Sequence, residues 1–167
     1  MKTINLSDVK NKIKDLVQEA NFELQDDVMK VINDMEKQEE SPAGKAVFEQ
    51  IKQNAQIARD EKLGLCQDTG LAVFFIEMGE DVRFNYDDGL ESLRDAVTEG
   101  TRAGYEEGYL RKSVVEDPIR RKNTGDNTPP IIHTDIVPGE HLKIIIMPKG
   151  GGSENMSRLA MLVPAQG

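Results

Sequence analysis

The stretch "GLCQDTGLAVFFIEMG", residues 64–79, marks the point at which the pattern of this chain changes. Its second half, "LAVFFIE" at 71–77, is a short continuous apolar run bounded by glycines, which is typical of a strand buried on both faces. Its first half is polar and contains the only cysteine, Cys66. The sequence therefore predicts a loop that brings a thiol to the start of a central strand.

The residues before this stretch predict helices. Two apolar stripes recur at helical spacing, and we expect both to pack in the core. Ser41 and Pro42 predict the N-cap and first position of a third helix. The stripes consist of Leu6, Val9, Ile13, Leu16, Val17 and Ala20, and of Leu24, Val28, Val31, Ile32 and Met35.

The residues after it predict a mixture of strands, two helices and two loops. Alternation at 81–86 indicates a strand, and a helical stripe follows it. The polar run "RRKNTGDNTPP" at 120–130 indicates a long loop. The segment 131–148 predicts two strands joined by a turn at 137–140, whose Pro and Gly suit type II geometry. Finally, "KGGGSENMSRLAMLV" at 149–163 predicts a glycine loop that leads into a helix.

These patterns predict one α+β domain over residues 1–167, helical over 1–60 and with a mixed sheet and site loops over 64–167. We expect the N-terminal helices to pack against a small mixed β-sheet that includes 71–77, 131–137 and 141–147. The apolar pattern of the last helix stops after one or two turns, so we expect the chain to be truncated.

Composition excludes several classes of protein. With 38% hydrophobic and 31% charged residues, the chain has the composition of a folded globular protein. A net charge of -9 argues against nucleic-acid binding, because phosphate contacts need a basic surface. We see no signal peptide, and no apolar run approaches the roughly 20 residues that span a bilayer. A single cysteine forms no internal disulfide, so we expect a cytoplasmic protein. From its charge and the lack of a long apolar run, we expect neither nucleic-acid nor membrane partners.

Three features carry possible chemistry, and each leaves alternatives open. Cys66 is a nucleophile, a metal ligand or a small buried side chain. As a nucleophile it needs a base, and the only histidines in the sequence are His133 and His141. The glycine loop is an anion site or a flexible connector. The segment 111–122 contains five basic and two acidic residues. It is either a binding site for a small anion or a solvated loop. Within it, Arg111 is placed to bind a carboxylate in bidentate fashion.

Three stretches in this order, "GLCQDTGLAVFFIEMG", "GYLRKSVVEDPIRRKNTGDNTPPIIHTDIVPGEHLKI" and "MPKGGGSENMSRL", resemble one family. They are similar to the alpha subunit, or the equivalent N-terminal region, of class I iron–sulfur fumarate hydratases and of the related L-tartrate dehydratases. The resemblance extends over essentially the whole chain. It implies a hydro-lyase that interconverts malate and fumarate, with an L-tartrate dehydratase or a non-catalytic binding or assembly module as alternatives.

The resemblance also implies a cofactor and a set of site residues. In the family, three cysteines hold a 4Fe-4S cluster, and its open iron acts as a Lewis acid on a hydroxy acid. By resemblance, Cys66 is the first of these ligands, and Asp68 is a candidate for the catalytic acid/base network. The residues implied to contact a small dicarboxylate substrate, by side chain or backbone, are Gln67, Asp68, Arg111, Gly151 and Gly152.

The chain departs from the family in lacking the other two cluster cysteines. By resemblance, a beta subunit or C-terminal domain supplies further basic residues and the catalytic base. We therefore expect the isolated chain to be inactive, and we expect a homodimer.

Overall fold

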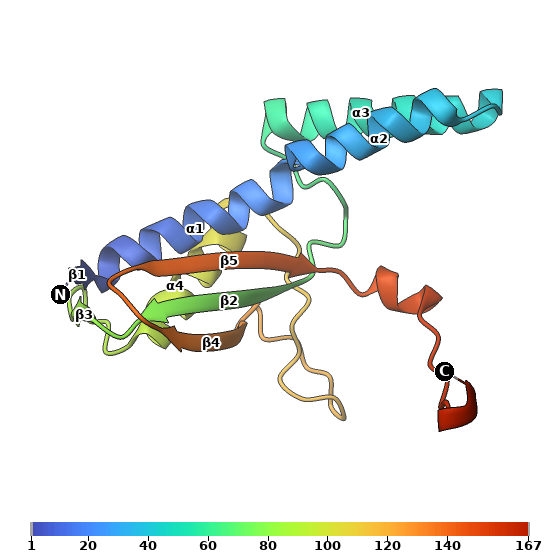
Figure 1. Cartoon of the computed structure of the whole chain (residues 1–167). Helices are drawn as coiled ribbons and strands as arrows, with labels where there is room; N and C mark the ends of the chain where they lie inside the picture. Colours follow the sequence, from blue (N-terminus) through green and yellow to red (C-terminus); the bar gives the residue numbers. More distant parts are fainter. Residues whose placement is uncertain (1, 167) are drawn as a thin grey trace.

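The structure, a computed structural model, describes residues 2–166 and confirms the α+β class (Figure 1). Helices α1–α3 follow a short first strand that the sequence does not predict. The elements are β1 (Lys2–Asn5), α1 (Leu6–Phe22), α2 (Asp26–Gln38), α3 (Pro42–Glu61), β2 (Leu71–Gly79), β3 (Val82–Asn85), α4 (Leu93–Glu107), β4 (Ile131–Val137), β5 (Leu142–Lys149), and the 3-10 helices η1 (Gly152–Met156) and η2 (Pro164–Gln166).

The three strands expected to share a sheet do so, in the order β4-β2-β5. The pair β2–β4 is parallel and the pair β2–β5 is antiparallel, so the sheet is mixed as expected. The strands β4 and β5 lie on opposite sides of β2, and the turn between them crosses the end of β2. There the N–H of Gly79 donates to the carbonyl of His141 at 2.8 Å. Gly139 has a φ of 111°, the positive φ that its turn position needs.

A second sheet contains the strand that alternation at 81–86 indicates. It is β3, and it pairs in parallel with β1, from Lys2 opposite Val82 to Asn5 opposite Asn85. The partner strand has only four residues, too few for an apolar pattern to reveal it.

Helices α1 and α4 cover one face of the three-stranded sheet (Figure 1). The β2 side chains Ala72, Phe74 and Ile76 point into this core and are buried. Phe75, on the opposite face, is 43% exposed. The expectation of a strand buried on both faces holds at Val73, which is 7% exposed, but is wrong at Leu71 and Phe75, because helices cover one face of β2 only. The buried core consists of Leu6, Val9, Ile13, Val17, Phe22, Ala72, Phe74, Ile76, Leu90, Ala96, Val97, Tyr105 and Leu110.

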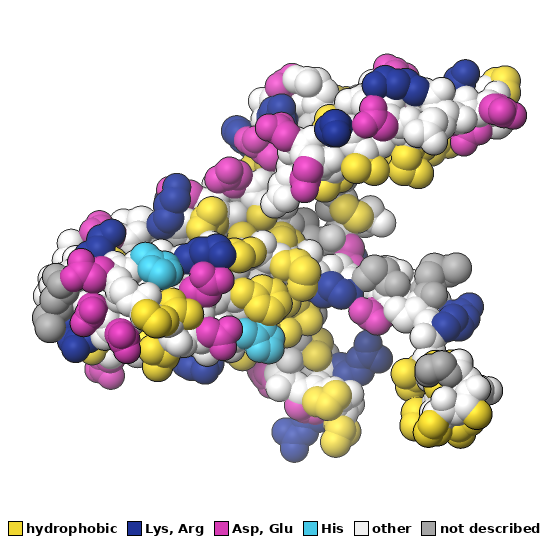
Figure 2. Space-filling view, in the orientation of Figure 1, with side chains coloured by type: hydrophobic (Ala, Val, Ile, Leu, Met, Phe, Trp, Pro, Cys, Tyr) yellow, Lys and Arg dark blue, Asp and Glu magenta, His cyan; other side chains and the backbone are white. Residues whose placement is uncertain are grey.

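Helices α2 and α3 form a hairpin that extends away from the rest of the molecule (Figure 1). The predicted cap of α3 is confirmed, because the Ser41 hydroxyl accepts a hydrogen bond from the N–H of Gly44 at 3.4 Å. The stripe on α2 does not enter the core: none of its residues is buried, and Val31 is 56% exposed. The prediction of core packing is wrong here because α2 packs mainly on α3, away from the sheet. Figure 2 shows hydrophobic side chains along this hairpin.

The helix predicted after the glycine loop does not form. Its place is taken by η1, and the residues from Ser157 to Val163 have no regular structure. Leu159 and Met161 are 92% and 89% exposed, so no packed apolar face supports a helix here. Within residues 2–166, no helix combines the length and apolarity needed to cross a membrane.

Candidate functional site

Gly70 brings the two predicted site loops together at one end of the sheet. It has a φ of 70°, and a Cβ added there would lie 2.4 Å from the carbonyl carbon of Lys149. Only glycine allows this conformation together with this close approach. The next residue, Leu71, pairs with Lys149 across the sheet. The loop before β2 and the glycine loop after β5 therefore lie side by side.

The carboxylate of Asp68 bridges these two loops. Its Oδ1 accepts a hydrogen bond from the N–H of Gly70 at 3.1 Å, and its Oδ2 accepts one from the N–H of Gly151 at 2.9 Å. The side chain is partly buried. Two backbone donors thus hold the carboxylate in place and leave each oxygen able to accept a further bond.

Arg111 approaches the same place from the segment that follows α4. The Thr69 hydroxyl donates to the carbonyl of Arg111 at 2.9 Å, which ties this segment to the loop that carries Asp68. Leu110 is buried beside it. The Arg111 side chain is exposed and has no hydrogen bond or ion pair to any described residue. Its guanidinium is therefore available to an anionic ligand.

Asp68, Arg111 and Gly151 line one pocket of about 470 Å³. Lys149 also lines it and forms an ion pair with Glu154, 2.8 Å from Nζ to Oε1, which lowers the pKa of Glu154. The full lining consists of Asp68, Gly70, Leu71, Arg111, Ser113, Lys149, Gly150, Gly151 and Glu154.

A larger hollow of about 600 Å³ lies beside α1 and β5 and contains none of the predicted site residues. Its only arginine, Arg59, lies 3.5 Å from a carboxylate oxygen of Glu23, so its charge is already compensated. The smaller pocket is therefore the better candidate for binding an anion.

Cys66 is exposed, and its thiol lies 3.4 Å from Oε1 of Gln67. Its backbone position is set by Leu65, whose N–H donates to the carbonyl of Asn21 at 2.8 Å and whose carbonyl accepts from Asn54 at 2.9 Å. Cys66, Gln67 and Gly152 do not line the pocket, although the first two immediately precede Asp68.

The ligand set for a metal is incomplete in the part of the chain that the structure describes. No group of three or more His, Cys, Asp or Glu side chains is arranged there to hold a metal ion. Cys66 contributes one sulfur, whereas an iron–sulfur cluster is held by several. The exposed thiol fits the role of a single ligand, and the residues present do not hold a cluster by themselves.

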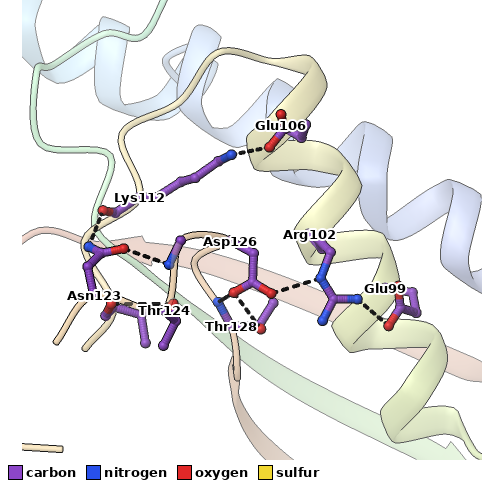
Figure 3. Close-up of polar contacts among 10 residues, drawn as sticks. Glu99, Arg102, Glu106, Lys112, Asn123, Thr124, Asp126 and Thr128 are labelled. Carbon is purple, nitrogen blue, oxygen red and sulfur yellow. Dashed lines mark hydrogen bonds and ion pairs between the residues drawn. The ribbon is translucent and has the colours of Figure 1, made fainter. Parts of the chain in front are cut away.

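Part of the basic segment is neutralised within the fold. Lys112 pairs with Glu106 of α4, as Figure 3 shows, and Lys122 pairs with Glu116 at 2.8 Å. These two lysines are therefore parts of the structure of the loop. Arg111 is the base of this segment that lines the pocket.

Sequence reasoning did not identify the buried residues behind the pocket. The Tyr105 hydroxyl donates to the carbonyls of Thr69 and Gly70, at 2.9 and 3.2 Å, and burial raises its pKa to about 12. Asn127 bonds to the backbone of Gly70 and Ser113. The only signal in the sequence was the polar run at 120–130, which indicated a functional loop without specifying a residue.

Comparison with known proteins shows which family the chain resembles. The family model described as fumarate hydratase (Fumerase) matches residues 10–167. A protein of Methanocaldococcus jannaschii named "Putative L(+)-tartrate dehydratase subunit alpha" is 34% identical over 169 residues, which cover 98% of this chain and 57% of that protein. The "L(+)-tartrate dehydratase subunit alpha" of Escherichia coli strain UTI89 is 33% identical over 178 residues, covering 100% of this chain and 56% of the relative.

The chain thus spans little more than half the length of these relatives. The family match extends over nearly the whole chain and includes all three stretches on which the resemblance was noted. This chain therefore belongs to the fumarate hydratase (Fumerase) family.

Proposed function

We propose that the complete protein is a hydro-lyase that reversibly removes water from a small hydroxy dicarboxylic acid, and that this chain forms part of its substrate site. The observation that carries the proposal is the pocket itself. It brings Asp68, Arg111 and Gly151 together from three separate segments of the chain. All three were expected from the sequence to be near the substrate.

The charges of the pocket suit such a substrate. A dicarboxylate carries two negative charges, and the uncompensated guanidinium of Arg111 binds one carboxylate through two parallel N–H bonds. Asp68 faces the same pocket, with its orientation set by Gly70 and Gly151. Its remaining lone pairs accept a hydrogen bond from the substrate hydroxyl or take part in proton transfer. This chain thus binds and orients the acid and contributes Asp68 to the acid/base network, while the base that abstracts the carbon-bound proton lies outside it.

The cofactor in this proposal is a 4Fe-4S cluster, with Cys66 as one of its ligands. Two further cysteines, absent from this chain, complete the set. When bound, the cluster supplies a Lewis acid that activates the leaving hydroxyl. The exposure of Cys66 supports this role, since a shielded thiol has no access to iron. Gln67 and Gly152 lie outside the pocket lining, and their contact with substrate rests on the family resemblance alone.

Malate and fumarate are the substrates we propose first, and L-tartrate is the alternative. The family match favours the former, and the names of the two relatives favour the latter. Malate and L-tartrate differ by one hydroxyl group. Assays of the complete protein with malate, fumarate and L-tartrate separate them, because a site that hydrogen-bonds a substrate hydroxyl strongly rejects the analogue that lacks it.

The proposed assembly includes a beta subunit or C-terminal domain and a homodimer of the complete protein in the cytoplasm. The relatives' names refer to an alpha subunit, which supports a second subunit. A non-catalytic binding or assembly module is the second candidate, favoured by the incomplete metal ligand set of this chain.

Anaerobic reconstitution with iron and sulfide tests the two candidates. The complete protein should bind iron and sulfide and dehydrate one of the hydroxy acids, and Cys66→Ser should lower both the iron content and the rate. Binding of a dicarboxylate without iron uptake or turnover would establish the non-catalytic module instead.

A further inference from the structure

We propose that Asn127 is a positioning residue, which fixes the guanidinium of Arg111 relative to the carboxylate of Asp68 so that both contact one substrate molecule. This inference rests on the proposed function. It assigns a role to the "GDNTPP" part of the polar loop, which the mechanism above does not use.

Asn127 connects the two segments that carry the pocket residues. Its Oδ1 accepts hydrogen bonds from the N–H groups of Ser113 and Val114, at 2.7 and 3.1 Å. Its Nδ2 donates to the carbonyl of Gly70 at 3.1 Å. Ser113 lies two residues after Arg111, and Gly70 lies two residues after Asp68. One side chain therefore sets the distance between the two segments.

The side chain of Asn127 is suited to a fixed position. Asn127 is fully buried, at 0% exposure, so water does not compete for these hydrogen bonds. Its φ is 61°, a left-handed conformation that asparagine tolerates better than most residues. A buried amide group that loses a hydrogen-bond partner destabilises the folded state. The three hydrogen bonds of Asn127 therefore resist any shift between the two segments.

Three further hydrogen bonds hold the loop that contains Asp68. The Thr69 hydroxyl binds the carbonyl of Arg111, and the Tyr105 hydroxyl binds the carbonyls of Thr69 and Gly70. Asn127 thus belongs to a set of contacts that hold the backbone on both sides of the pocket. None of these hydroxyl and amide groups lines the pocket, so their effect on substrate passes through Asp68 and Arg111.

The loop that carries Asn127 is itself anchored to α4. Figure 3 shows Arg102 of α4 between Glu99 and Asp126. The Nε atom of Arg102 lies 2.8 Å from Oδ2 of Asp126. Asp126 also accepts hydrogen bonds from the N–H and hydroxyl of Thr128, at 3.0 and 2.8 Å. Asp126, which precedes Asn127, is therefore tied to α4, the helix that also presents Tyr105, and Thr128 is tied to Asp126.

The test uses the complete enzyme with the variants Asn127→Gly and Thr69→Val. Glycine accepts the positive φ of position 127, so the first variant removes the amide without adding backbone strain. Valine is nearly isosteric with threonine, so the second removes only the bond to Arg111. Thr69→Ser, which keeps the hydroxyl, is the rescue variant. Thr101→Val is the control, because the buried Thr101 hydroxyl bonds only to Val97 within its own helix.

We expect Asn127→Gly to lower kcat/KM up to about 10-fold, mainly through KM, because misplacing the guanidinium of Arg111 costs no more than replacing it by an ammonium group. Thr69→Val should act in the same direction, while Thr69→Ser and Thr101→Val stay near the wild type. In an Arg111→Lys background, Asn127→Gly should cost much less than in the wild type, because both changes act through one guanidinium. The amide hydrogens of Ser113 and Val114 should exchange faster in Asn127→Gly.

Equal losses of kcat/KM in the wild-type and Arg111→Lys backgrounds would overturn the positioning role. An unchanged KM with only a lower unfolding midpoint would also overturn it and leave a purely structural role. Unchanged amide exchange at Ser113 and Val114 would refute the geometry without any assay. If the wild-type enzyme itself turns over none of the three acids, the proposed function fails, and the positioning role fails with it.

Discussion

The Oδ2 atom of Asp68 lies 2.9 Å from the backbone nitrogen of Gly151, although 83 positions separate the two residues in the chain. This bond joins the loop before β2 to the glycine loop after β5. It also means that one N–H of the glycine loop is committed to a protein carboxylate. The anion-binding capacity of the pocket therefore depends on Arg111 more than on Gly151.

The carboxylate of Asp68 should be needed for turnover. In the complete enzyme, Asp68→Asn keeps the size of the side chain but removes its charge and its capacity to accept a proton. We expect kcat to fall by about 10²–10⁴-fold, the usual contribution of an acid/base group. Steady-state rates with malate and L-tartrate provide the measurement. Asp135→Asn, on the exposed face of β4, is the control and should leave the rate unchanged.

The guanidinium of Arg111 should determine substrate affinity. Lysine keeps the positive charge but loses the planar fork that binds a carboxylate through two bonds. We expect Arg111→Lys to raise KM about 10-fold, the equivalent of about 1.4 kcal/mol. Arg120→Lys changes an exposed arginine of the same basic segment that does not line the pocket, and its KM should match the wild type. An unchanged KM in both variants would show that the segment acts only through its charge, which both substitutions keep.

Glycine at position 70 should be required for the fold of the site. In Gly70→Ala the added Cβ meets both a positive φ and the backbone of Lys149. We expect a loss of about 2–4 kcal/mol in the free energy of unfolding, measured by denaturant titration. Gly89 is the matched control: its φ of 71° is almost the same, but no atom lies within 4 Å of an added Cβ. Gly89→Ala should therefore cost only about 1 kcal/mol.

Asp126 should make the stability of the protein depend on pH in the acid range. Burial acts to raise the pKa of this carboxyl, but hydrogen bonds from Arg102 and Thr128 outweigh it and lower the pKa to about 2. The unfolded value is about 3.9, so the ionised form stabilises the folded state above about pH 4. This contribution is lost as the pH falls from about 4 to about 2.

Unfolding titrations between acid and neutral pH test this prediction with Asp126→Asn. The variant should be less stable than the wild type by about 1–2 kcal/mol at neutral pH, a value reduced by the partial exposure of the Arg102–Asp126 pair. The two proteins should converge near the pKa of about 2. A constant difference across the whole range would show that the ion pair is not its source.

Local patterns in the sequence were sufficient for most of the elements. The apolar run at 71–77 predicted β2, and two strand patterns around a turn at 137–140 predicted β4 and β5, because such patterns lie within a few positions of the chain. Ser41 predicted its cap because the bond to Gly44 lies within a few residues. The family motifs placed Asp68 and Arg111 as candidates, and both line one pocket. Their roles in catalysis stay predictions.

Other features depended on neighbours that are distant in the chain. The apolar stripe of α2 resembles that of α1, but only α1 faces the sheet, so the same pattern gives one exposed and one buried helix. Residues 157–163 have helical spacing without a surface to pack on, and they do not form a helix. Periodicity shows which side of a helix is apolar, and not whether anything covers it.

The sequence by itself determined the class of the fold, the central strand and the family, because these follow from local patterns and short motifs. Only the tertiary structure decided which residues support the pocket. The side chains of Asn127, Tyr105 and Thr69 form hydrogen bonds with backbone groups that are distant in the sequence. Every residue carries the same backbone N–H and C=O groups, proline's missing N–H apart, so no side-chain pattern marks these partners before the chain is folded.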